Sequence, residues 1–189
     1  MPAELAPISI AKFTYAFQCL DTNSNGTIEA DDFLRLSRDL KKFHGWAKGD
    51  PRAETMRNEL LDYWEMLCML TDNDGSGDID LDEYLLFHRL MIEETEEFGE
   101  APPWAQALVD TLIASVDADG DGKIDPTEYG NYLTAIGSQM NAATAFGKLD
   151  LDGSGYLELS ELNDLMAEYL TSTNTTDPGN YLLTGGWPE

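Results

Sequence analysis

Residues with oxygen-bearing side chains recur in four short segments of the chain with the same internal spacing. The segments cover residues 21–32, 72–83, 117–128 and 150–161, and each begins with Asp and ends with Asp or Glu. Calcium binds six to eight oxygens at about 2.3–2.6 Å, and a twelve-residue loop can surround it with oxygens at positions one, three, five, seven, nine and twelve. The spacing therefore predicts four loops that bind a hard divalent cation.

The candidate metal ligands stand at positions one, three, five, seven and twelve. They are Asp21, Asn23, Asn25, Thr27 and Asp32 in the first loop, Asp72, Asp74, Ser76, Asp78 and Glu83 in the second, Asp117, Asp119, Asp121, Lys123 and Glu128 in the third, and Asp150, Asp152, Ser154, Tyr156 and Glu161 in the fourth. Position six is glycine in every loop, where the chain turns sharply with a backbone geometry that a Cβ disfavours. Position eight is Ile or Leu, which faces inward and can pair with a neighbouring loop as a short strand. We therefore expect the loops to come in pairs.

The first loop differs from the others in its ligand chemistry. It has Asn at positions three and five, and it ends in Asp32, whose side chain is one methylene shorter than Glu. A ligand that reaches the ion through a single oxygen favours six-coordination, which suits magnesium or weak calcium binding. We expect three to four calcium ions in all, with magnesium as a competitor, most strongly in the first loop. The third loop has acids at positions one, three, five, nine and twelve and is expected to bind most tightly.

Helices must position these loops, and the flanking residues predict them. Apolar residues stand four positions before each loop, and Phe33, Tyr84, Tyr129 and Leu162 directly follow position twelve, as on the buried faces of entering and exiting helices. In the third loop, Asp125, Pro126 and Glu128 also form a helix-start signal.

This helix-loop-helix pattern resembles the EF-hand, and the match covers nearly the full chain. The resemblance implies an all-α fold of four EF-hands in two paired lobes, packed into one compact globule, with short two-stranded pairing between loops. Pro102 and Pro103 interrupt the chain between the halves. We therefore expect an N-terminal pair at residues 1–98 and a C-terminal pair with a tail at 99–189, joined by a hinge that lets the lobes fold face to face.

The spacing of the loops narrows the resemblance further. The first two loops are separated by a helix to about Phe43, a break at residues 44–51 and a long second helix, a wider interval than calmodulin-like sensors use. With the central break and the C-terminal tail at 177–182, this layout resembles sarcoplasmic calcium-binding proteins and calerythrin-like bacterial proteins. That resemblance implies a calcium and magnesium buffer whose tail packs over the core.

Composition excludes several other classes of protein. The chain has 36 acidic and 11 basic residues and a net charge of −25, which disfavours nucleic acid or a membrane surface as a partner. No secretory signal precedes the first loop, so we expect a cytoplasmic monomer that binds calcium ions. His44 and His88 have no nucleophile motif beside them, so we expect no catalytic residue, no cofactor-binding residue and no enzyme activity.

Two other functions stay open at this point. A calcium sensor would expose a flexible, Met-rich groove to a protein target. Of the seven Met residues in the chain, five stand at helical spacing among other apolar residues, namely Met66, Met69, Met91, Met140 and Met166. A small-ligand carrier similar to luciferin-binding proteins would need an aromatic cavity, which four Trp residues could help to line.

Overall fold

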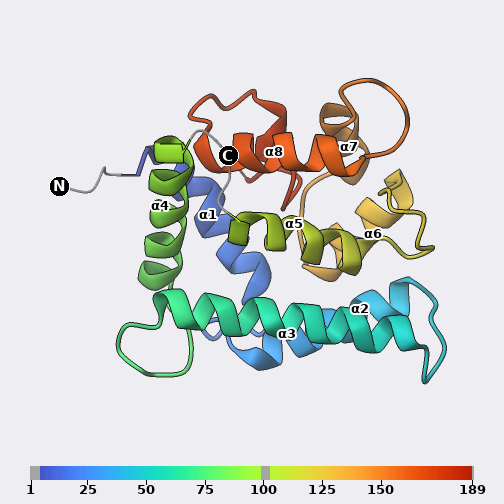
Figure 1. Cartoon of the computed structure of the whole chain (residues 1–189), viewed down its shortest axis with the longest axis horizontal. Helices are drawn as coiled ribbons and strands as arrows, with labels where there is room; N and C mark the ends of the chain where they lie inside the picture. Colours follow the sequence, from blue (N-terminus) through green and yellow to red (C-terminus); the bar gives the residue numbers. More distant parts are fainter. Residues whose placement is uncertain (1–4, 99–102, 189) are drawn as a thin grey trace.

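The computed structural model describes residues 5–98 and 103–188, which form an all-helical, compact body. The helices are α1 (Pro7–Leu20), α2 (Ala30–Phe43), α3 (Pro51–Thr71), α4 (Leu81–Phe98), α5 (Pro103–Val116), α6 (Pro126–Ala135), α7 (Ala142–Leu149), α8 (Leu159–Thr171) and the 3-10 helix η1 (Pro178–Tyr181). Each predicted loop lies between two consecutive α-helices (Figure 1). None of these helices combines the length and apolar composition of a membrane-spanning segment.

Local signals in the sequence explain where the helices begin. The Asp125 side chain accepts hydrogen bonds from the amides of Thr127 and Glu128, and Glu128 binds back to the Asp125 amide, which forms the expected capping box of α6. Asp50 caps α3 in a similar way, with Pro51 at the first helical position. The observed ends of α2 and α4, at Phe43 and Phe98, confirm the predicted ones.

The four loops form two pairs through one antiparallel bridge each. Ile28 and Ile79 exchange backbone hydrogen bonds of 2.8 and 3.0 Å, and Ile124 and Leu157 exchange bonds of 3.0 and 2.9 Å. All four side chains are buried. In the described residues the predicted two-stranded pairing is therefore reduced to a single bridge between position-eight residues.

The two halves of the chain pack against each other. Helix α3 lies beside α5, α2 beside α6, and α4 beside α8, so each contact joins a helix before residue 99 to one after residue 102 (Figure 1). The buried apolar residues of all eight α-helices form one continuous core. The expected hinge at residues 99–102 lies outside the described residues, and the division at residue 98 stays a prediction.

The C-terminal tail covers this core, as the resemblance implied. Leu182 is buried, and the hydroxyls of Tyr129 and Tyr132 on α6 donate to the carbonyls of Tyr181 and Leu183. Gly179 passes so close to α8 that a Cβ there would lie 2.5 Å from the Leu165 carbonyl oxygen.

A buried lysine joins the tail to the first helix. The Lys12 side chain on α1 is fully buried, and its ammonium donates to Asn180 Oδ1 at 2.9 Å and to the Ser172 carbonyl at 3.1 Å. Burial is also the main reason that the pKa of Lys12 is lowered to about 8. The first helix and the tail are thereby connected across the length of the sequence.

Candidate metal centres

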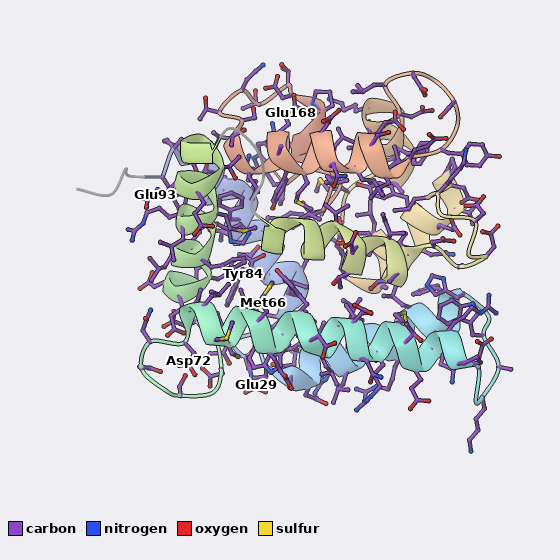
Figure 2. All side chains as sticks on the ribbon, viewed as in Figure 1. Glu29, Met66, Asp72, Tyr84, Glu93 and Glu168 are labelled. Carbon is purple, nitrogen blue, oxygen red and sulfur yellow. The ribbon has the colours of Figure 1, made fainter. Side chains whose placement is uncertain are left out.

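Three of the four loops bring carboxylates together. The groups are Asp72, Asp74 and Glu83 in the second loop, Asp117, Asp119 and Asp121 in the third, and Asp150, Asp152 and Glu161 in the fourth. Within each group, one oxygen from each carboxylate lies within 4.8 Å of the others. Figure 2 shows Asp72 in its loop at the end of α3, while Tyr84 lies on the inner side of α4. All three groups offer only hard oxygen donors, which suits calcium or magnesium.

Backbone amides hold the first carboxylate of each loop in place. The amide of the position-six glycine donates to that Asp in all four loops, at 2.9 Å for Gly26, 3.1 Å for Gly77, 2.8 Å for Gly122 and 3.0 Å for Gly155. These glycines have φ between +80° and +93°, a left-handed conformation that other residues adopt only with strain. Glycine at position six therefore lets the loop close around its own ligand.

The last carboxylate of the fourth loop has an oxygen that protein atoms leave without a hydrogen bond. Glu161 Oε2 accepts from the Glu158 amide at 3.1 Å, while Oε1 is buried and has no partner among the described residues. A buried acceptor without a partner is costly unless a cation or water satisfies it. Since Asp150 and Asp152 lie beside it, the residues of this loop fit a divalent ion.

The third loop holds both oxygens of its last carboxylate by backbone amides, as the second loop holds Glu83. Glu128 is not in the carboxylate group of its loop, and its oxygens accept from the amides of Ala118 at 2.7 Å and Asp125 at 2.9 Å. Burial is the main cause that raises the pKa of Glu128 above its ordinary value. A cation bound by Asp117, Asp119 and Asp121 would offset the free-energy cost of burying the charged Glu128 carboxylate. The role of Glu128 as a ligand stays a prediction.

The first loop satisfies its own acids more fully. Asp32 Oδ1 accepts from the Thr22 hydroxyl at 2.7 Å, the Thr22 amide at 3.1 Å and the Asn23 side chain at 3.3 Å, and Oδ2 accepts from the Glu29 amide at 2.9 Å. Asn25 Oδ1 accepts from the amide and hydroxyl of Thr27. The expected ligands thus lie in one loop and accept hydrogen bonds mainly from groups of that same loop. The weaker calcium binding of this loop stays a prediction.

The side chains at position seven of the third and fourth loops point away from the carboxylates. Lys123 Nζ donates to Glu158 Oε1 at 2.6 Å and lies 5.2 Å from the centre of the Tyr156 ring. The Tyr156 carbonyl accepts from the Ser154 hydroxyl within its loop at 3.0 Å. At this position the backbone oxygen, and not the side chain, is the candidate ligand.

Two residues at position two of the loops matter here but were not expected from the sequence. The Thr22 hydroxyl donates a hydrogen bond to the Asp32 carboxylate. The Ala118 backbone contacts both the Glu128 carboxylate and the segment that precedes α3. A hydroxyl at position two, opposite a short Asp at position twelve, could have indicated the first contact. No pattern in the sequence indicates the second, because its partners are about 70 residues away.

Comparison with known proteins agrees with this geometry. The family model described as EF hand matches residues 14–37, 108–133 and 142–166, which contain the first, third and fourth loops. Sarcoplasmic calcium-binding proteins I, III and IV of Branchiostoma lanceolatum are 28% identical over 173 residues, covering 91% of this chain and 92% of theirs. Calerythrin of Saccharopolyspora erythraea is 26% identical, covering 77% of this chain and 82% of its own.

Solved structures resemble the fold over almost its full length. A sarcoplasmic calcium-binding protein from amphioxus has a TM-score of 0.73 and 25% identity, over 98% of this chain and 100% of that one. The coelenterazine-binding protein of Renilla muelleri, in its calcium-loaded apo form, also has a TM-score of 0.73, with 18% identity over 96% and 99% of the two chains. At this low identity, the similarity to the coelenterazine-binding protein shows a shared fold and nothing about ligand binding.

Proposed function

Because the chain belongs to the EF-hand superfamily and resembles sarcoplasmic calcium-binding proteins and calerythrin, we propose that it is a monomeric cytoplasmic buffer for calcium and magnesium. The relatives are calcium-binding proteins by name, and EF-hand calcium binding is the property shared with them. The buffer role goes further, because it requires that calcium binding is not coupled to the exposure of a target surface.

The packing of the two halves against each other is the observation that carries this proposal. Met56, Met91 and Met166 lie in the core with at most 1% of their surface exposed, so they line no open groove. A sensor presents such residues to its target after calcium binds. Here the apolar faces of the two halves already bury one another. This packing disfavours a sensor and supports a buffer that takes up and releases metal ions.

The exposed apolar residues support the same conclusion. The large ones among the described residues are Ile10, Phe43, Met69, Leu70, Leu90, Leu151, Tyr156 and Leu159. They belong to six different helices or loops, and no helix supplies more than two of them. Single exposed apolar residues are normal on a monomer and do not mark a binding surface.

Two pockets between the halves bear on the carrier alternative. Tyr63, Tyr84, Tyr132 and Ser115 help to line one of about 70 Å³, and Met66 and Thr111 help to line another of about 190 Å³. Sites for drug-sized molecules measure about 300–1,000 Å³. Each pocket is therefore too small for a luciferin-sized molecule unless the helices move apart, and the buffer proposal is favoured.

The proposal is tested by the fluorescence of a hydrophobic dye added to magnesium-saturated protein before and after saturating calcium. We expect a flat or falling signal, because the apolar faces stay in contact. Calmodulin treated in the same way is the positive control for an opening groove. A strong calcium-dependent rise would overturn the buffer proposal and favour the sensor.

A further inference from the structure

The segment between the first two loops contacts the third loop. We call residues 44–52, which connect α2 to the first turn of α3, the linker segment. Its Trp46 indole donates to the Ala118 carbonyl at 3.1 Å, and Arg52 donates to the same oxygen at 2.9 Å. His44 Nε2 donates to the Ser115 carbonyl at 2.8 Å, at the end of α5. A segment of the first half thus reaches the entry to a metal loop of the second half.

The contacted residue lies between two candidate ligands. Ala118 is at position two of its loop, flanked by Asp117 and Asp119, and its amide donates to the Glu128 carboxylate at 2.7 Å. Its carbonyl is bound by the linker segment. Both polar groups of the Ala118 backbone are therefore fixed, one by the last carboxylate of the loop and the other by the opposite half.

This contact distinguishes the third loop from its counterparts. Position two is Asn73 in the second loop and Leu151 in the fourth, and both are partly or fully exposed. Among the hydrogen bonds of the described chain, no side chain from another helix donates to either of their carbonyls. The third loop is also the only one of the four with Asp at positions one, three and five.

The linker segment is itself held rigidly. Arg52 binds Asp50 at 2.9 Å, and its guanidinium lies 4.8 Å from the centre of the Trp46 ring. The His44 and Trp46 ring centres are 4.6 Å apart. Because these groups constrain one another, the two donors meet the Ala118 carbonyl with little conformational freedom left to lose.

We propose that Trp46 and Arg52 are positioning residues for the third calcium site. They hold the Ala118 backbone so that Asp117 and Asp119 are placed before the ion arrives, which lowers the entropy cost of binding. By linkage, an ion in the third loop stabilises the linker segment to the same extent. Packing in the N-terminal half then sets calcium affinity in the C-terminal half.

The experiment is a calcium titration followed by NMR at the amides of the four position-six glycines, each of which reports its own loop. Trp46→Phe removes the indole donor but keeps a ring, and Arg52→Met removes the guanidinium. We expect each variant to weaken binding at Gly122 by about threefold to tenfold, the effect of one hydrogen bond. Gly155 should shift less, through the bridge between Ile124 and Leu157, and Gly26 and Gly77 should not change.

Two further variants separate positioning from general stability. Arg57→Met removes an exposed guanidinium from the same helix without touching the third loop, and should leave all four glycine isotherms unchanged. Arg52→Lys keeps a donor and should recover part of the affinity at Gly122. In the unmutated protein, the Trp46 indole resonance should shift as Gly122 titrates.

The proposal is overturned by either of two results. If both variants leave the Gly122 isotherm unchanged, the linker segment does not position the third loop. If they weaken all four loops equally, the segment contributes only to overall stability. The premise that the third loop binds calcium is checked separately by the response of Gly122 in the unmutated protein.

Discussion

At the scale of single residues, His88 is buried where no acidic group of the described chain would stabilise a positive charge on its ring. Its ring lies 4.1 Å from Phe13 and 4.4 Å from Tyr84 between ring centres, and its Nδ1 donates to the Tyr84 carbonyl at 2.9 Å. Burial and the nearby Lys12 ammonium lower its pKa to about 4, with burial the larger cause. His88 is therefore a buried core residue.

The His88 pKa predicts a loss of stability in mild acid. Between pH 6.5 and about 4 the unfolded chain binds a proton at His88 that the folded chain does not, so the free energy of unfolding falls as pH falls. One such group contributes a slope of up to about 1.4 kcal/mol per pH unit. We expect urea unfolding of calcium-saturated His88→Phe to show a shallower pH dependence across this window. His44→Gln, at a half-exposed position, is the control and should change the slope less; an unaltered slope in His88→Phe would contradict the assignment.

The sequence predicted candidate ligands in each loop, but not how their hydrogen bonds differ. Spacing alone located Asp72, Asp117 and Asp150, because position one and the position-six glycine are local features. It could not show that Glu128 is drawn to the Ala118 amide while Glu161 keeps a free oxygen. Such differences depend on burial and on partners from other helices.

At the scale of elements, the first loop differs from the others in how it is closed. Asp32 accepts four hydrogen bonds from its own loop, so calcium must compete with Thr22, Asn23 and Glu29 for this carboxylate. A shorter carboxylate also favours the compact octahedral shell of magnesium. We therefore expect this loop to prefer magnesium to calcium.

Asp32→Glu is expected to shift this preference. The longer side chain can reach the ion with both oxygens, and we expect calcium affinity at the first loop to rise by roughly tenfold, about 1.4 kcal/mol, with less competition from magnesium. The Gly26 amide resonance measures it during calcium titrations with and without magnesium. Glu161→Asp in the fourth loop is the matched reverse change and should weaken calcium there. Unchanged or weaker calcium binding at Gly26 in Asp32→Glu would contradict this account.

Helix boundaries were predictable because their signals are local. Asp125 with Pro126, the end of α2 at Phe43 and the end of α4 at Phe98 all follow from capping and chain-breaking residues. The contact of the linker segment with Ala118 was not predictable, because it joins residues 66 and 72 positions apart. A hydrogen bond between residues so far apart along the chain produces no periodic pattern in the sequence.

At the scale of the whole molecule, charge couples metal binding to stability. The net charge is −25, and four divalent ions would bring it to −25 + 8 = −17. Within each of the three carboxylate groups, one oxygen per side chain lies within 4.8 Å of the others, and without a cation these charges repel. Ion binding therefore contributes directly to the free energy of unfolding.

We expect calcium to raise the melting temperature of chelator-treated protein strongly. At a free concentration of about 1,000 times Kd, each filled site adds about 4 kcal/mol, which corresponds to roughly 10 °C for a domain of this size. Calorimetry of the stripped protein, with calcium added stepwise, measures the shift. Added sodium chloride at equal ionic strength is the control for screening alone. The same transition temperature with and without calcium would rule out this coupling.

The compact arrangement of the halves was predictable in kind, but its closing contacts were not. Four similar loops, a central break and the tail pointed to paired lobes folded together, and the described residues show that packing. The bonds of Lys12 to Ser172 and Asn180 were not anticipated, since a lone Lys on an apolar helix usually extends toward solvent.

The position of Lys12 has a consequence for the order in which the protein is made. The residues that accept its hydrogen bonds are synthesised 160 and 168 positions after it, so a growing chain carries this lysine for most of translation without its final partners. Until Asn180 has been added, α1 can dock against the core only by burying an ammonium that lacks an acceptor, which is unfavourable. We therefore expect the N-terminal helix to dock late, together with the C-terminal end of the polypeptide.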